Sequence, residues 1–187
     1  YALLFFLLLF TACTAPHEKV SVDYTTYVNP FIGTDFTGNT YPGAQAPFGM
    51  VQLSPDNGLP GWDRISGYFY PDSTIAGFSH THLSGTGAGD LYDISFMPVT
   101  LPYKEAEAPL GIHSRFSHDD ESATAGYYQV LLKDYNINVE LTATERCGIQ
   151  RYTFPEAQAA IFLNLKKAMN WDFTNDSRIE IVDSVTI

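Results

Sequence analysis

Basic residues are scarce in this sequence: Lys and Arg together number 10, against 21 Asp and Glu. The formal net charge at pH 7 is therefore −11. A surface of this sign repels the phosphate backbone of nucleic acids, so we expect no nucleic-acid partner. The charge is compatible with neutral substrates such as sugars and with the binding of cations.

Long apolar runs are also missing. The longest, Ala2–Phe10, has nine residues, whereas a membrane-spanning helix needs about 20. It fits the apolar region of a signal peptide, and the following Thr11-Ala12-Cys13 resembles a bacterial lipobox. We therefore expect residues 1–13 to be a lipoprotein signal peptide with a truncated start, and residues 14–26 to be a tether. Lipidated Cys13 would anchor the protein in the bacterial cell envelope, facing the periplasm or on the outer-membrane surface.

Cysteine is rare, with Cys147 as the only one besides Cys13. If Cys13 carries lipid, no disulfide can form within the chain. The alternation of apolar and polar residues around Cys147 predicts a small packing residue on a strand.

No window offers a long amphipathic helix, and the periodicity beyond Gly111 is that of strands instead. Two period-two runs flank Lys133–Asn136, which is typical of a hairpin turn. The apolar residues of these runs are Tyr128, Val130, Leu132, Ile137, Val139, Leu141 and Ala143. The sequence therefore predicts an all-β sandwich.

Two further segments carry strand-like patterns. Ala159–Leu165 is a short apolar run consistent with a buried strand. Ile179, Ile181, Val185 and Ile187 alternate, and this pattern is still running at the last residue. We therefore expect more of the protein to follow.

Residues 20–60 are rich in Gly and Pro, which exclude long helices, yet they contain many apolar residues. This combination predicts an ordered, irregular segment with a short strand near Gly49–Leu53. In the segment that follows, Tyr68 and Tyr70 alternate as on a strand, and either of them can belong to the core or to a binding rim.

The densest set of polar residues is the stretch FSHTHLSGTGAGD, from Phe78 to Asp90. On a strand, His80 and His82 would share a face and could chelate a metal together with Asp90 or Asp93. The other histidines show no ligand spacing that would complete such a site. A phosphate loop is disfavoured because no Lys-Ser/Thr pair follows the glycines. The alternating glycines predict a sharp bend or a close approach to a ligand or a second domain, with a packed polar loop as the alternative.

Trp62 follows a Pro-Gly pair and has Asp63 and Arg64 beside it. A flat indole can cover the apolar face of a pyranose while polar neighbours bind its hydroxyls. The alternatives are a tryptophan that covers the core and a surface ion pair of little energetic value. No nucleophile elbow surrounds Ser66 or Ser79, and no pair of carboxylates is singled out by its spacing, so the residues alone do not indicate catalysis.

Sequence similarity to one family extends over three long runs: Tyr27–Asn57, Gly61–Val99 and Gly126–Pro155. Together they resemble glycoside hydrolase family 92, whose members are α-mannosidases. The resemblance implies that residues 27–187 form the N-terminal β-sandwich domain, supersandwich-like and truncated at its C-terminal end, of a two-domain enzyme. The family's C-terminal (α/α)6 barrel is missing from this sequence.

The resemblance also implies a function. The family removes terminal α-mannose with inversion, and a calcium ion in the mannose subsite helps to distort the sugar. Because the general acid, the general base and most calcium ligands come from the barrel, we expect no catalytic residue and no metal ligand in this chain. The chain alone would then be inactive.

The resemblance places Trp62 on the leaving-sugar side of the pocket and the loop His80–Asp90 at the domain interface. We therefore expect Trp62, Asp63, His80, His82 and Asp90 to contact substrate. The expected partners are α-mannoside glycans, the protein's own C-terminal domain and, through the lipid anchor, the membrane. The alternative is a non-catalytic, surface-anchored, glycan-binding β-sandwich lipoprotein.

Overall fold

The computed structural model describes residues 22–85, 87–103, 111–166, 174–184 and 186. Within these ranges the chain forms strands and short 3₁₀ helices but no α-helix, so the all-β prediction is confirmed. The 3₁₀ helices are η1 (Tyr24–Tyr27), η2 (Trp62–Arg64) and η3 (His118–Asp120). None of the helical segments within the described ranges is long and apolar enough to cross a membrane. The expected signal peptide and Cys13 lie outside the described residues.

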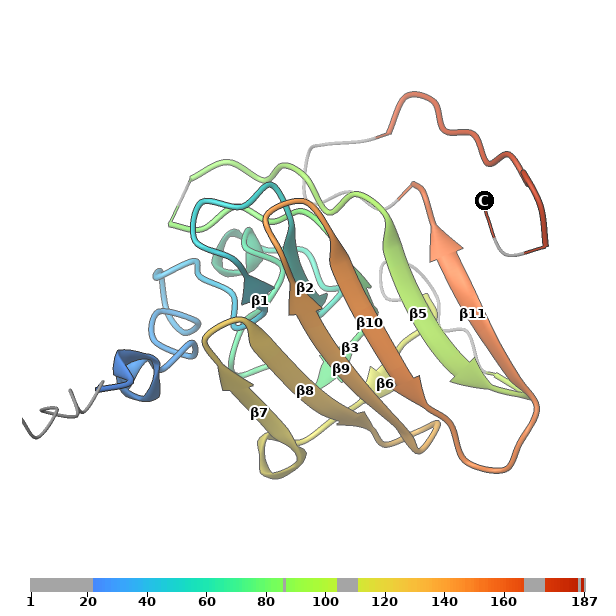
Figure 1. Cartoon of the computed structure of the whole chain (residues 1–187), viewed down its shortest axis with the longest axis horizontal. Helices are drawn as coiled ribbons and strands as arrows, with labels where there is room; N and C mark the ends of the chain where they lie inside the picture. Colours follow the sequence, from blue (N-terminus) through green and yellow to red (C-terminus); the bar gives the residue numbers. More distant parts are fainter. Residues whose placement is uncertain (1–21, 86, 104–110, 167–173, 185, 187) are drawn as a thin grey trace, which may run out of the picture.

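One antiparallel sheet has five strands in the order β1-β2-β4-β5-β11 (Figure 1). Its strands are β1 (Ala44–Gln45), β2 (Gln52–Asp56), β4 (Gly77–Ser79), β5 (Ser95–Thr100) and β11 (Ala159–Asn164). The edge strand β11 pairs with β5 along its whole length, from Ala159 opposite Thr100 to Asn164 opposite Ser95.

The second sheet is an antiparallel meander of four strands in the order β10-β9-β8-β7. Its strands are β7 (Glu121–Thr124), β8 (Tyr127–Leu132), β9 (Ile137–Ala143) and β10 (Gly148–Thr153). The predicted hairpin is confirmed, because Leu132 pairs with Ile137 across the four-residue turn. A further two-stranded sheet joins β3 (Thr74–Ile75) to β6 (Ser114–Arg115).

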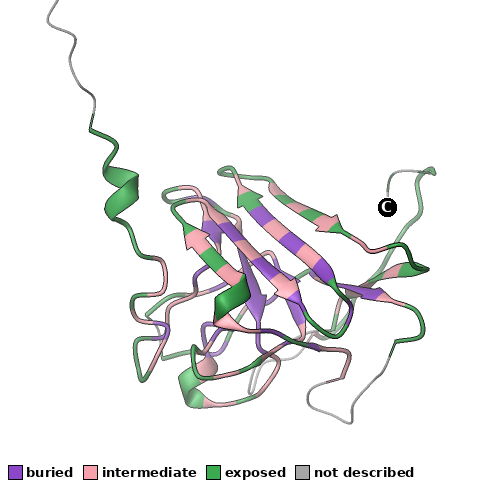
Figure 2. Ribbon diagram, turned by 90° about the horizontal axis from the view of Figure 1, so that it is seen from below, coloured by how far each residue is buried: buried purple, intermediate pink, exposed green. Residues whose placement is uncertain are grey.

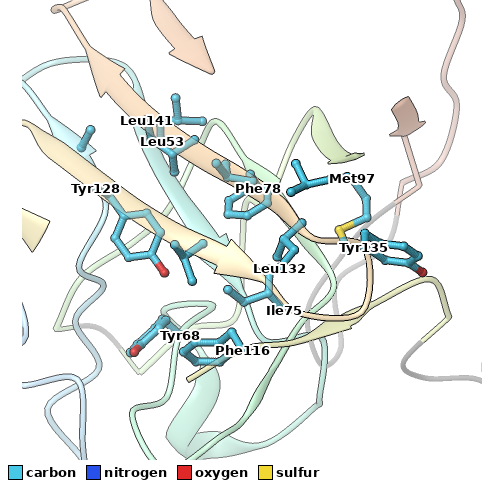
Figure 3. Close-up of a cluster of buried hydrophobic side chains, with 14 of the residues drawn as sticks. Leu53, Tyr68, Ile75, Phe78, Met97, Phe116, Tyr128, Leu132, Tyr135 and Leu141 are labelled. Carbon is cyan, nitrogen blue, oxygen red and sulfur yellow. The ribbon is translucent and has the colours of Figure 1, made fainter. Parts of the chain in front are cut away.

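The core forms where the two larger sheets face each other (Figure 3). Leu53 and Phe78 come from the five-stranded sheet, and Tyr128, Leu132 and Leu141 come from the meander. Buried and more exposed residues alternate along β8 and β9, which appears as bands of colour in Figure 2. Removing these inward side chains from water is the main driving force for this packing.

Two predicted strands exist but differ in detail. The strand predicted near Gly49–Leu53 begins only at Gln52 and extends to Asp56. The run Ala159–Leu165 does form a strand, but the prediction that it is buried was wrong. It forms the edge of its sheet, and the side chain of Ile161 is 51% exposed.

Two other predictions were wrong. Ile179 and Ile181 lie in no strand and are exposed, and none of the strands that the structure describes pairs with residues 174–184. The other two residues of that pattern, Val185 and Ile187, lie outside the described residues. Cys147 is an exposed free thiol in the turn between β9 and β10, and it does not pack on a strand.

Candidate functional site

Trp62 and the polar loop meet on the surface of the structure. Trp62 begins η2 and is 55% exposed. A Cβ atom added to Gly87 would lie 3.5 Å from Cζ2 and 3.6 Å from Cη2 of the Trp62 ring, which is ordinary van der Waals contact. The loop therefore approaches the indole edge at a glycine. Two features that the sequence analysis singled out separately thus form one surface.

Backbone hydrogen bonds close the base of the polar loop. His80 N donates to Asp93 O at 3.0 Å, and Tyr92 N donates to Thr81 O at 3.0 Å. The Thr81 hydroxyl donates to the Asp93 carboxylate at 3.1 Å. The two ends of the loop, at Thr81 and Tyr92, therefore lie side by side. Within the loop, Gly85 N donates to Asn39 O at 2.6 Å, which joins it to the irregular N-terminal segment.

His82 is buried and anchors the loop from below. Its Nδ1 donates to Gln52 O at 2.7 Å, and its Nε2 lies 2.9 Å from Asp56 Oδ1 and 3.1 Å from Ser79 Oγ. Since both ring nitrogens are occupied by protein oxygens, His82 acts here as a positioning residue. The three side chains of Asp56, His82 and Ser79 also do not form a catalytic triad, because Asp56 and Ser79 contact the same ring nitrogen.

His80 lies in a different environment from His82. Strand β4 ends at Ser79, so His80 and His82 do not share a strand face as a metal site would require. The His80 ring packs edge-on against Phe96 at 5.6 Å, and its Nδ1 lies 3.0 Å from Ile94 O. Within the described ranges no group of three or more His, Cys, Asp or Glu side chains could hold a metal.

Gly67 is essential to this arrangement, and the sequence analysis did not identify it. Its φ is +89°, and an added Cβ would lie 2.7 Å from Asp56 Oδ1, 2.7 Å from Tyr92 Cε1 and 2.9 Å from His82 Cδ2. The Tyr92 hydroxyl donates to Ile65 O, next to η2. Tyr92 therefore connects the end of the polar loop to the helix that carries Trp62.

The remaining predicted residues are surface carboxylates. Asp90 Oδ1 accepts from Leu91 N at 2.8 Å, and the Asp63 side chain is half exposed. The Arg64 side chain lies 3.9 Å from Asp63, but it forms its short bidentate contacts, at 2.6 and 2.5 Å, with Asp72. The hydrogen bond that Arg64 donates to Asp72 raises the pKa of Arg64. The Asp63–Arg64 ion pair, which was the alternative to sugar binding, is therefore secondary to the Arg64–Asp72 pair, which holds η2 in place.

Sequence reasoning missed Asp56, Gly67, Ser79 and Tyr92, which position the loop. No local pattern identifies them, since Asp56 lies 26 residues before His82 in the chain. The ambiguity about the two tyrosines is resolved by their exposure. Tyr68 is buried in the core, whereas Tyr70 is 38% exposed, and neither lies in a strand.

Residues 27–187 match the Glycosyl hydrolase family 92 N-terminal domain. Among solved structures, the chain is similar to the family GH92 α-mannosidase BT3965 from Bacteroides thetaiotaomicron, with 46% identity and a TM-score of 0.73 over 78% of this chain and 20% of that one. It is also similar to the inverting GH92 mannosidase BT2199 from B. thetaiotaomicron VPI-5482, with 33% identity and a TM-score of 0.60 over 74% and 19%.

A curated relative is an uncharacterized secreted glycosidase of Arthroderma benhamiae, 28% identical over 144 residues, which covers 73% of this chain and 18% of that protein. The chain thus spans about a fifth of the length of each of these relatives.

Proposed function

This chain belongs to glycosyl hydrolase family 92, of which it carries the N-terminal domain, and from that premise we propose that the whole protein is an exo-α-mannosidase. The 46% identity to an α-mannosidase structure is the observation that carries the proposal. In this proposal the enzyme is calcium-dependent and inverting, and it acts on mannose-containing glycans. The activity, substrates and partners belong to the whole protein, not to this domain alone.

We propose that this domain contributes one wall of the substrate pocket, around Trp62. A pyranose ring would pack against the exposed indole, while the neighbouring loop offers backbone and carboxylate groups to its hydroxyls. Asp63, His80, His82 and Asp90 remain candidates for this wall. The buried position of His82 favours a role in holding the loop over direct sugar contact.

Large apolar side chains exposed in the N-terminal loops support a contact with another part of the protein. Ile32, Phe36, Phe48 and Met50 have exposed fractions of 73%, 80%, 102% and 73%. Exposed apolar side chains that gather in one patch mark interaction sites. We propose that these four side chains face the protein's own C-terminal domain.

The described residues do not by themselves fit a calcium site, because they offer no cluster of three or more acidic or other metal-ligating side chains. Calcium prefers six to eight oxygen ligands. The ion would therefore be held mainly by the rest of the protein, and none of the roles proposed for this chain depends on it.

The secreted relative supports an extracytoplasmic location, and we propose that lipid on Cys13 anchors the protein in the cell envelope. Incorporation of labelled palmitate into the wild type, and its loss in Cys13→Ser, would support the anchor. Equal labelling of both proteins would contradict it.

The test of the enzymatic proposal is an assay of the full-length protein on an aryl α-mannoside and on α-linked mannobioses, with NMR detection of the product. β-Mannose should be released first, and a calcium chelator should abolish turnover until calcium is restored. Initial release of α-mannose would contradict inversion, and turnover unaffected by chelation would contradict the calcium requirement. Tight binding of mannosides without any turnover would favour the alternative, a non-catalytic glycan-binding lipoprotein.

A further inference from the structure

A concave site lies among residues other than Trp62 and the polar loop. It is a cleft of about 350 Å³ between the segment that follows η1, the residue Tyr70, and the junction of η3 and β7. Its lining residues are Asn29, Phe31, Thr34, Asp35, Tyr70, His118 and Glu121. Small-molecule sites in proteins measure roughly 300–1,000 Å³, so this volume lies at the small end of that range and is large enough for one monosaccharide unit.

One wall of the cleft is aromatic. The rings of Tyr70 and His118 stack with centroids 3.9 Å apart and an angle of 3° between their planes. Phe31 meets Tyr70 edge-on at 6.0 Å. Because His118 Nε2 donates to Tyr70 O at 2.8 Å, the imidazole is held parallel to the phenol. A rigid, partly exposed aromatic ring of this kind can pack against the apolar face of a pyranose.

A buried carboxylate forms the floor. The Glu121 side chain is 1% exposed, and it lies 2.7 Å from His118 Nδ1. The hydroxyls of Tyr68 and Tyr128 donate to its Oε2 and Oε1 at 2.9 and 2.5 Å. Burial, followed by the charge of Glu121, raises the pKa of both tyrosines, so they stay protonated donors.

These contacts leave Glu121 with capacity for a ligand. A carboxylate offers about four lone-pair positions, and the contacts among described residues occupy three. The remaining position, on Oε1, can accept from a ligand hydroxyl. A polar side chain held this firmly loses little conformational entropy when a ligand binds.

Two side chains at the rim complete a set of polar groups. Asn29 Oδ1 accepts from Phe31 N at 3.0 Å, which leaves the Asn29 amide group as a donor. Asp35 Oδ1 accepts from Phe36 N at 2.6 Å, which leaves Asp35 Oδ2 as an acceptor. One donor and two acceptors beside an aromatic wall match a polyhydroxylated ring.

The charges of the cleft exclude other ligand classes. Its lining residues include two carboxylates, Asp35 and Glu121, and no Lys or Arg, and the one basic side chain among them, His118, is engaged with Glu121. A phosphate or carboxylate ligand would therefore be repelled. The cleft is not a metal site either, because the described part of the chain contains no group of three or more His, Cys, Asp or Glu side chains that could hold a metal ion.

We propose that this cleft binds a single neutral pyranose unit, with the ring packed on Tyr70 and its hydroxyls hydrogen-bonded to Glu121, Asp35 and Asn29. The cleft shares no lining residue with the Trp62 surface, so it adds a second sugar contact to the domain. The inference goes beyond the proposed mannosidase activity and does not require it.

The test is a crystal structure of the full-length protein soaked with methyl α-D-mannopyranoside, together with Tyr70→Ala, Tyr70→Phe and Tyr103→Ala. Tyr103 is a matched control, since it is 39% exposed and packs edge-on against Phe162. Crystals of wild type, Tyr70→Phe and Tyr103→Ala should all show electron density for the sugar against the aromatic ring of residue 70. Tyr70→Ala should lose that density and weaken this binding by about tenfold, with turnover of an aryl mannoside unchanged.

Sugar density found only away from Tyr70, or a cleft filled by another segment of the protein, would overturn the inference. If methyl mannoside 6-phosphate occupied the cleft to the same extent as the neutral methyl mannoside, the proposed exclusion of anionic ligands would be wrong. Asn29→Ala provides a second variant if Tyr70→Ala fails to fold, and it should weaken the same density. If the protein showed sugar density in the cleft but no mannosidase activity, the proposed enzymatic function would be refuted and this site would stand. If it showed mannosidase activity but no sugar density in the cleft, only the site would be refuted.

Discussion

The meander β7–β10 and the loop-rich segment 27–94 are stabilised in different ways. In the meander, strands adjacent in sequence are adjacent in space, and alternate side chains such as Val130 and Val139 enter the core directly opposite each other. In the loop-rich segment, buried polar groups connect distant residues, as in the contact of Asp56 with His82. The first region depends on apolar burial, and the second depends on a small number of specific polar contacts.

This difference explains why the candidate sites lie where they do. A surface that binds a polar ligand needs backbone and side chains held in irregular conformations. The loop-rich segment provides them in the Trp62 surface, while the meander contributes only the buried floor of the cleft, through Glu121. The loops should therefore be sensitive to polar and glycine substitutions that the meander tolerates.

The largest effect should come from Asp56→Ala. Because the side chains of Asp56 and His82 are almost fully buried, removing the carboxylate leaves His82 Nε2 without its charged partner. We expect a loss of about 3–5 kcal/mol in the free energy of unfolding, measured by urea denaturation. The control is Asp120→Ala beside the meander, whose partner Lys133 is as exposed as Asp120, and it should cost less than about 1 kcal/mol. Equal costs would show that the two regions do not differ in this way.

Gly67→Ala and Gly126→Ala sharpen the same comparison, since both glycines have positive φ. The new methyl group at residue 67 would collide with Asp56, Tyr92 and His82, whereas nothing lies within 4 Å at residue 126. We expect about 1 kcal/mol for Gly126→Ala, from backbone conformation alone. Gly67→Ala should cost about 2–4 kcal/mol, because overpacking is added to that penalty. Thermal unfolding of both variants would measure the difference, and similar melting temperatures would contradict it.

Trp62→Ala tests whether the loop region, and not the meander, contacts substrate. In the full-length enzyme it should lower kcat/KM for mannobioses by about three- to tenfold, and for an aryl mannoside by less, because stacking on the leaving sugar is lost. Ile149→Ala on β10 is the matched control, with 60% exposure against 55% for Trp62, and should leave both rates unchanged. An equal loss on both substrates would indicate that Trp62 is structural.

The smallest effect should appear in the meander, at the exposed pair of Arg151 and Glu140. Hydrogen bonds from Arg151 and then Tyr127 lower the pKa of Glu140 from 4.5 to about 2. A carboxylate with a lowered pKa stabilises the fold above its unfolded pKa and loses that contribution as the pH falls through the folded value. The difference in denaturation midpoint between wild type and Arg151→Ala should therefore shrink between pH 5 and pH 2. A difference independent of pH would contradict this.

The sequence predicted the hairpin of β8 and β9 because period-two alternation is a local property of the chain and decides which side chains face inward. The same rule failed at Ile179 and Ile181, where alternation occurs without a partner strand. It also failed at Cys147, which lies in a turn, and could not separate Tyr68 in the core from Tyr70 at a cleft. The prominence of Trp62 and of the glycine loop was evident from composition, but their contact was not.

The amino-acid sequence alone therefore determined the all-β class, the hairpin of β8 and β9 and the membership of the family, since these follow from local patterns and from matching residues. Only the tertiary structure decided that His82 is an internal anchor, that Gly67 admits no side chain, and that Tyr70, His118 and Glu121 line one cleft. The physical reason is distance along the chain: the partners of these residues lie up to several tens of positions away, and only folding brings them within hydrogen-bonding range.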